Sequence, residues 1–186
     1  SDAGRDGLAA MGRLAASGSL RMLLLWRVSA GAEELRALAE SGGLGRLVSL
    51  DLHGNEFGAD GAAVLADSGQ DAPAALDLTG CKLGDAGVAR LATWPGLAAC
   101  RVLMLGENGL TAKGLRPLLD SPHLSGLQAL GLFGNRRLGA AGLTALLRSP
   151  LMARLQSLEA GSCATGAAGV ARAIKAGPAL PELRHA

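Results

Sequence analysis

A leucine pattern recurs along this chain at a nearly constant interval. Its clearest copy reads Leu47-x-x-Leu50-x-Leu52-x-x-Asn55-x-Phe57-Gly58-x-x-Gly61. The second leucine of each copy falls at Leu23, Leu50, Leu76, Leu103, Leu130 and Leu158, and subtraction gives intervals of 27, 26, 27, 27 and 28 residues. A period of this length predicts an array of small units that stack on one another.

Each unit divides into a strand-like half and a helix-like half. The L-x-L core alternates as a half-buried strand does, whereas residues 61–66 and 142–147 carry apolar side chains at helical spacing. The ninth position of the units holds Val28, Asn55, Cys81, Asn108, Asn135 and Cys163, and the chain has no asparagine elsewhere. A carboxamide there can satisfy backbone groups that are buried where the chain turns after the strand. We therefore predict a structural ladder formed by Asn55, Cys81, Asn108, Asn135 and Cys163.

The pattern LxxLxLxxNxLG, followed by xxGxxxLA, resembles the consensus of leucine-rich repeats, and the period resembles that of the ribonuclease-inhibitor-like subclass. The resemblance covers almost the whole chain. It implies an α/β fold: a right-handed solenoid, a segment of a horseshoe, with parallel strands on the concave face and helices on the convex face. We expect a single domain over residues 1–186 with about six repeats, in which residues 1–17 are the helix half of a partial repeat and residues 175–186 form a tail.

Two departures from the repeat predict local irregularities. The segment 135–138 has one residue more than the corresponding turn of other units, which predicts a bulge, and Pro73 replaces the first leucine of the third unit. The last unit has Ala160 and Thr165 where leucine is expected, so its strand is predicted to be weaker.

The composition excludes several classes of protein. A hydrophobic content of 49% argues against disorder, and an aromatic content of 2% implies an aliphatic core. The net charge of +2 comes from interspersed charges, which does not favour nucleic acid, and the longest apolar run, 22–26, is far too short to span a membrane. No secretory signal is seen, and the excess of arginine over lysine is typical of GC-rich bacterial genomes. Three scattered cysteines, Cys81, Cys100 and Cys163, match no metal or disulfide spacing, so we expect reduced thiols and a cytoplasmic protein.

No catalytic motif is found. The chain lacks a GxSxG elbow, a GxxxxGK[ST] loop, an HExxH helix and an EF-hand loop, so we predict a protein that is not an enzyme and has no metal or cofactor. One alternative comes from Asp51 and His53, which share a strand face and so could orient an imidazole as a general base. An exposed contact surface is the favoured interpretation of this pair.

The residues between the core leucines predict a binding surface, because they must project onto the concave wall. The candidate partner-binding residues are Arg21, Leu24, Trp26, Arg27, Asp51, His53, Asp77, Thr79, Met104, Glu107, Phe133 and Glu159. Trp26 and Phe133 occupy the same position of their units, and exposed aromatic residues are frequent interface hot spots. The alternative is that Trp26 covers the end of the first repeat and that Phe133 packs against the turn at 136–137.

These features favour a protein-binding scaffold with a partner of unknown identity; a partner with a basic element would suit the acidic middle of the wall. Two alternatives remain. The chain could be a regulatory or substrate-recognition part of a larger protein, for example one that regulates a GTPase or carries a fused catalytic domain. It could also be a structural module that self-associates through uncapped solenoid ends, because the end faces of a solenoid need polar caps.

Overall fold

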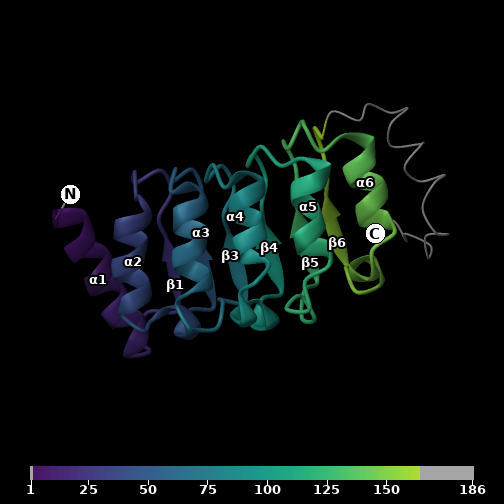
Figure 1. The fold of residues 1–186 in the computed structure, drawn as a ribbon. Helices are drawn as coiled ribbons and strands as arrows, with labels where there is room; N and C mark the ends of the chain where they lie inside the picture. The colour runs from purple at the N-terminus through teal and green to yellow at the C-terminus, as the bar shows by residue number, and fades with distance from the viewer. Residues whose placement is uncertain (1, 164–186) are drawn as a thin grey trace.

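The computed structural model of the protein describes residues 2–163. Within this range strands and helices alternate along the chain (Figure 1). The strands are β1 (Met22–Leu24), β2 (Ser49–Asp51), β3 (Ala75–Asp77), β4 (Val102–Met104), β5 (Ala129–Gly131) and β6 (Ser157–Glu159). The α-helices are α1 (Asp2–Ala16), α2 (Ala32–Glu40), α3 (Gly58–Ala66), α4 (Gly84–Leu91), α5 (Ala112–Leu119) and α6 (Gly139–Leu147). Three connections contain short 3-10 helices: Leu44–Arg46, Pro95–Ala99 and Pro150–Ala153.

The six strands form one parallel sheet in chain order. Its register follows the sequence repeat, because the central leucines pair in one row across the sheet: Leu23, Leu50, Leu76, Leu103, Leu130 and Leu158. Each helix returns the chain to the start of the next strand. The predicted α/β solenoid is thus confirmed, and the predicted tail at 175–186 lies outside the described residues.

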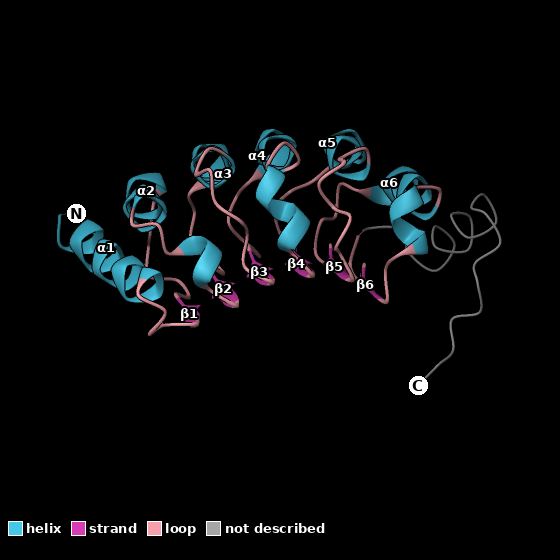
Figure 2. Cartoon of the chain, turned by 90° about the horizontal axis from the view of Figure 1, so that it is seen from below, coloured by secondary structure: helices cyan, strands magenta, loops and turns pink. Residues whose placement is uncertain are grey.

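The array is curved, with the strands on the inner side of the arc and the helices on the outer side (Figure 2). The cause is geometric: neighbouring strands lie about 4.8 Å apart, whereas packed helices need about 8–10 Å. The sheet therefore has one face against the helices and one open, concave face.

The core lies between the two layers and consists mainly of leucine. In the second unit, Leu50 and Leu52 of the strand segment are fully buried, as are Leu65 of the helix and Leu44 of the preceding connection. The residue between the two strand leucines, Asp51, is only partly buried because side chains alternate across a strand. The alternation thus determines which residues reach the open face.

Each ladder asparagine joins two units. The Asn135 Oδ1 accepts hydrogen bonds from the backbone N–H groups of Asn108 and Leu110, at 2.9 and 3.1 Å, and its Nδ2 donates to the carbonyl oxygens of Leu105 and Leu132, at 2.9 and 2.8 Å. Asn55 makes the same four kinds of contact three units earlier in the array. Each carboxamide satisfies backbone groups that face no water.

The cysteines in this column make fewer bonds. The Cys81 Sγ lies 3.2 Å from the carbonyl oxygen of Leu52, and the Cys163 Sγ lies 3.3 Å from that of Leu132. A thiol has one weak donor, whereas a carboxamide has two strong donors and an acceptor. A cysteine in this column therefore satisfies fewer of the buried backbone groups than an asparagine does.

A buried tryptophan links the connections that run from helices to strands. Trp94 is 1% exposed, and its Nε1 donates to the carbonyl oxygen of Gln70 at 2.8 Å. The Gln70 Nε2 in turn donates to the carbonyl oxygen of Ala39 at 2.5 Å. These bonds join three successive units, so the contacts of Trp94 extend across the repeat boundary.

The extra residue at 135–138 is absorbed in the turn. The N–H of Leu138 donates to the carbonyl oxygen of Asn135 at 2.9 Å, and that of Arg136 donates to the carbonyl oxygen of Gly134 at 2.9 Å. Leu138 is buried, as are Phe57, Leu83 and Leu110 in the corresponding turns. The turn therefore keeps the core position filled and exposes Arg136 instead.

The residue before the ladder position has a left-handed backbone in every unit. The φ angles are 46° at Arg27, 71° at Gly54, 65° at Gly80, 53° at Glu107, 71° at Gly134 and 56° at Ser162. This conformation costs about 1 kcal/mol or more for residues other than glycine. Three units use glycine, whereas the others hold a polar or charged side chain at the rim of the open face.

Candidate functional site

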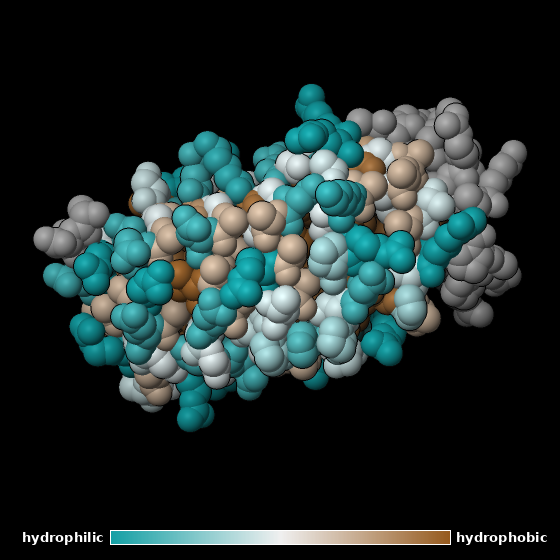
Figure 3. Space-filling view, viewed as in Figure 1, coloured by the Kyte–Doolittle hydropathy of each residue, from teal (hydrophilic) through white to brown (hydrophobic). Residues whose placement is uncertain are grey.

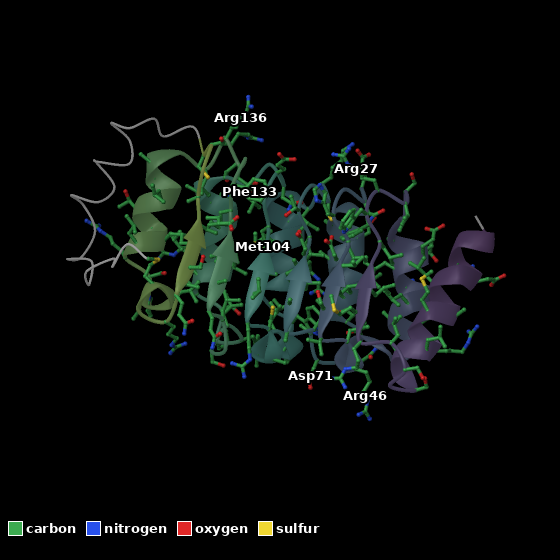
Figure 4. All side chains as sticks on the ribbon, turned by 180° about the vertical axis from the view of Figure 1, so that it is seen from behind. Arg27, Arg46, Asp71, Met104, Phe133 and Arg136 are labelled. Carbon is green, nitrogen blue, oxygen red and sulfur yellow. The ribbon has the colours of Figure 1, made fainter. Side chains whose placement is uncertain are left out.

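The open face of the sheet is the candidate site. Its rows follow the strands, and Figure 4 shows this face with Met104 on the sheet and with Arg27, Phe133 and Arg136 toward the edge where the strands end. Arg46 and Asp71 lie at the opposite edge, where the strands begin. All but one of the candidate residues are exposed or partly exposed on the described structure.

The first row is apolar. Met22, Leu24 and Trp26 are 59%, 53% and 62% exposed, while Leu23 and Leu25 between them are buried. The Trp26 Nε1 donates to Oδ2 of Asp51 at 2.7 Å, so the indole leans toward the second unit and away from the end of the array. This direction is opposite to the one expected if Trp26 covered the end of the first repeat.

The second and third rows are acidic. Asp51 and Asp77 pair across β2 and β3. Each carboxylate accepts a hydrogen bond from the backbone N–H two residues later, Asp51 from His53 at 2.9 Å and Asp77 from Thr79 at 2.8 Å. Asp51 thus bonds to a backbone N–H and to Trp26, and within the described structure it makes no hydrogen bond to the His53 imidazole. The arrangement does not supply the oriented base considered above.

Thr79 does not belong to the exposed surface, contrary to the sequence expectation. It is 2% exposed, and its hydroxyl has no hydrogen-bond partner within the described structure. The alternation rule predicts the direction of this side chain but not how far its neighbours cover it. A short side chain between larger ones is covered even when it points outward.

Glycines let larger side chains of the preceding or following unit lie flat on the sheet. A Cβ on Gly106 would lie 2.5 Å from the Phe133 ring, and one on Gly131 would lie 2.5 Å from the Met104 methyl group. Phe133 therefore rests against the fourth unit, in addition to any contact at 136–137. Sequence reasoning missed these glycines, although their place in outward-facing columns was a signal.

Charged side chains at the edge of the open face, where the strands end, also lie over glycines of the next unit. A Cβ on Gly54 would lie 2.7 Å from Cγ of Arg27, and one on Gly134 would lie 2.7 Å from Cγ of Glu107. A hollow of about 550 Å³ is found at this rim, and Arg27, His53 and Glu107 are among the residues that line it. In the last described row, Glu159 is exposed. Arg21, at the start of the first row, is exposed as well.

The thiols are protected from reaction. Burial raises the pKa of Cys81 to about 12 and that of Cys100 to about 12, and it also raises the pKa of Cys163. The nucleophile is the thiolate, which at pH 8 is then on the order of 1 in 10,000 of these two thiols. We expect iodoacetamide at pH 8 to leave Cys81 and Cys100 unmodified in the native protein and to alkylate them in urea, as followed by peptide mass spectrometry. Native alkylation at the rate of free cysteine would contradict this.

The same shift predicts a pH dependence of stability. An unfolded cysteine ionises near its ordinary pKa of 9.0, whereas the buried thiol stays neutral up to about 12. Above pH 9 the unfolded state therefore binds fewer protons, so the free energy of unfolding falls as the pH rises from 9 toward 12. Below pH 9 these thiols contribute no slope.

The described residues give no sign of a metal centre. Among them no three histidine, cysteine, aspartate or glutamate residues are grouped so that they could hold a metal ion. No helix in this part of the chain is long and apolar enough to cross a membrane.

The two faces differ in character. Hydrophilic side chains are spread over the helices on the outer face, with apolar residues scattered between them (Figure 3). A hollow of about 760 Å³ lies between α1 and α2, lined by residues that include Arg5, Arg13 and Glu40. The exposed large apolar side chains of the strand segments lie instead on the inner face.

The sequence pattern of a known family, described as leucine-rich repeat, matches the chain at residues 47–66 and 75–92. The first match begins just before β2 and runs to the end of α3, and the second runs from the start of β3 to just after α4. Each match is thus one strand, one turn and one helix of the array. No curated protein matches the chain.

Proposed function

Because the chain is a leucine-rich-repeat protein, we propose that it is a non-enzymatic scaffold whose concave sheet face binds another protein. The observation that carries this proposal is the open face itself, on which apolar, acidic and aromatic side chains lie side by side on short parallel strands. Surfaces that combine exposed apolar and aromatic side chains with polar neighbours are typical of protein recognition.

We also propose that the protein belongs to the ribonuclease-inhibitor-like subclass of leucine-rich repeats and that it is located in the cytoplasm. The intervals of 26 to 28 residues and the α-helix after each strand support the subclass. The three cysteines are free and buried, which is the usual state in a reducing compartment.

The dimensions of the face suit a modest interface. Six strands at about 4.8 Å span roughly 29 Å, which is near the lower end of what a standard interface of about 800 Å² per partner needs. The acidic pair Asp51 and Asp77 near the middle favours a partner with a basic element there.

The experiment that tests this function is affinity capture from a cell lysate with the wild-type chain and with two face variants, Asp77→Arg and Phe133→Ala. We expect each variant to weaken capture of the same proteins roughly tenfold, because each changes a side chain on the open face. Circular dichroism and thermal unfolding verify that each variant is folded before it is compared.

The matched control is Asp60→Arg, the same charge reversal on the outer face, where Asp60 is exposed on α3. Capture by this variant should equal that of the wild type. If the wild type captures nothing specific, or if all three variants capture alike, the concave face is not the binding surface.

A further inference from the structure

Two carboxylates lie side by side on the open face, in the second and third units. Asp51 and Asp77 are directly opposite each other across β2 and β3, and side chains in such positions have Cβ atoms about 4.5–5.5 Å apart. Like charges in this arrangement are destabilising. Within residues 2–163 neither carboxylate forms an ion pair with a basic side chain of the chain. The protein itself therefore does not neutralise the pair.

The two carboxylates differ in their hydrogen bonds. Asp51 accepts from the indole N–H of Trp26 at 2.7 Å and from the backbone N–H of His53 at 2.9 Å. Asp77 accepts one hydrogen bond within the described structure, on Oδ1 from the backbone N–H of Thr79 at 2.8 Å, so that its Oδ2 has no partner there. One strong acceptor of the pair is thus available on this face.

A buried hydroxyl stands beside this acceptor. Thr79 lies two residues after Asp77, so the two side chains point to the same face of the sheet. Thr79 is 2% exposed, and its Oγ1 makes no hydrogen bond in the part of the chain that the structure describes. An unpaired buried hydroxyl costs free energy that a valine of the same shape would not. A hydroxyl left in this state next to two carboxylates points to a ligand that bonds to all three groups.

Two rings lean toward Thr79 from neighbouring units. Cδ2 of His53 lies 4.0 Å from the position of a Cβ on Gly80, and the Phe133 ring lies over Gly106, the residue of the fourth unit that corresponds to Thr79. Both are partly exposed side chains, which can change rotamer while the backbone of the sheet stays in place. A ligand can therefore reach the hydroxyl by displacing a ring.

The neighbours of the acidic pair along the sheet are apolar. Leu24 is opposite Asp51 on one side, and Met104 is opposite Asp77 on the other. The indole of Trp26 also lies against Asp51, through the hydrogen bond already described. The site thus combines negative charge with apolar and aromatic surfaces, which suits a long side chain with an apolar stem and a cationic head.

The number of acceptors favours arginine over lysine. A guanidinium group has five N–H donors in a planar fork, so it can bond to two carboxylates and a hydroxyl together, and its face stacks on aromatic rings. An ammonium group is a compact charge with three donors and has no flat face to stack. The acceptors of this site lie on two neighbouring strands, which a fork spans better than a point charge does.

We propose that Asp51, Asp77 and Thr79 bind an arginine side chain of the partner protein. Its guanidinium donates to the free Oδ2 of Asp77, to the Asp51 carboxylate and to the Thr79 hydroxyl, and it lies beside the indole of Trp26. This inference rests on the proposed function, because it names the partner residue that this part of the binding face recognises.

The probe is N-acetyl-arginine amide, titrated at constant ionic strength and followed through the two indole N–H signals in proton–nitrogen correlation spectra. The Trp26 N–H bonds to Asp51, so its signal should shift and reach saturation at millimolar probe. The Trp94 N–H is buried against the carbonyl of Gln70 and should not shift, which makes it an internal control. The Trp94→Phe variant assigns the two signals. N-acetyl-citrulline amide, which has nearly the same shape without the charge, should bind at least tenfold more weakly, and N-acetyl-lysine amide about threefold more weakly.

A matched pair of variants tests the charge. Asp77→Asn keeps an acceptor for the backbone N–H of Thr79 but removes the negative charge, so it should weaken binding of the arginine probe about fivefold. Asp60→Asn makes the same change at an exposed position of α3 on the outer face and should leave the affinity within about twofold.

Thr79→Val separates a binding role from a merely structural one. Because it removes an unpaired buried hydroxyl, the variant should raise the melting temperature of the free protein by about 2–4 °C. It should also weaken binding of the arginine probe about fivefold, since the ligand loses one hydrogen bond. A residue that only fills space would give the first effect without the second.

The proposal is wrong if the arginine probe does not shift the Trp26 signal, if the citrulline probe binds equally well, or if Asp77→Asn or Thr79→Val leaves the affinity unchanged. Suppose that the probe fails in this way while Asp77→Arg and Phe133→Ala still lose capture of lysate proteins. The proposed function would then stand, and this inference alone would be removed.

Discussion

Asn135→Ala is expected to lower the free energy of unfolding by about 4 kcal/mol, because the change leaves three buried backbone groups without a partner and a fourth, the Leu132 carbonyl, with only the Cys163 thiol. Each unpaired group costs about 1–3 kcal/mol before relaxation. Asn135 is fully buried, and its two donors and one acceptor serve the units on both sides of the turn. Urea denaturation followed by circular dichroism measures the loss.

The controls come from the chain itself. Asn135→Cys introduces the residue that already stands at positions 81 and 163, where each thiol has one weak donor for two nearby carbonyl oxygens, so its cost should be intermediate, about 2 kcal/mol. Arg136→Ala, next to it in sequence but exposed, should change stability by less than about 0.5 kcal/mol. If Asn135→Ala costs no more than Arg136→Ala, the ladder does not stabilise the array.

Trp94→Ala should cost about 4 kcal/mol as well, the range found when a large buried aromatic side chain is truncated. Trp94 is among the largest fully buried side chains in the described core, and its removal also leaves the carbonyl of Gln70 without a donor. The same urea titration measures the effect.

Trp94→Phe separates packing from hydrogen bonding. The phenyl ring keeps most of the buried volume but lacks the indole N–H, so we expect a loss of about 1–2 kcal/mol. Equal losses for Trp94→Phe and Trp94→Ala would mean that the bond to Gln70, rather than the packing, is the main contribution. A loss below about 1 kcal/mol for Trp94→Ala would contradict the burial of this residue.

The fold could be predicted from the sequence because the repeat specifies both the structure of each unit and the way in which neighbouring units stack. The central leucines, with their near-constant interval, predict both the buried side of each strand and the register between strands, and Leu50 pairs with Leu76 as the interval requires. The helices followed from the apolar spacing at 61–66 and 142–147, which lies within α3 and α6. Because the units repeat, the strand and helix predicted for one unit can be checked against those predicted for the others.

The details of the open face followed less well, because they depend on how neighbouring side chains share space. The sequence predicted that Thr79 points outward, yet the side chain is covered. It also gave no reason to expect that Phe133 lies on Gly106, or that Trp26 bonds to Asp51. Such contacts are set by the rotamers of long side chains between strands about 4.8 Å apart, which a pattern of apolar and polar residues does not determine.

The contacts inside this protein run from each unit to the next: strand to adjacent strand, helix to adjacent helix and ladder residue to adjacent turn. A solenoid of this kind gains its stability as a sum of nearest-neighbour steps. The two ends of the array are therefore coupled only through the chain of unit-to-unit contacts between them. A partner that touches both Trp26 and Phe133 would connect units that have no direct contact of their own. Bound protein would then act as a brace along the inside of the arc, raising the cooperativity of unfolding as well as the stability.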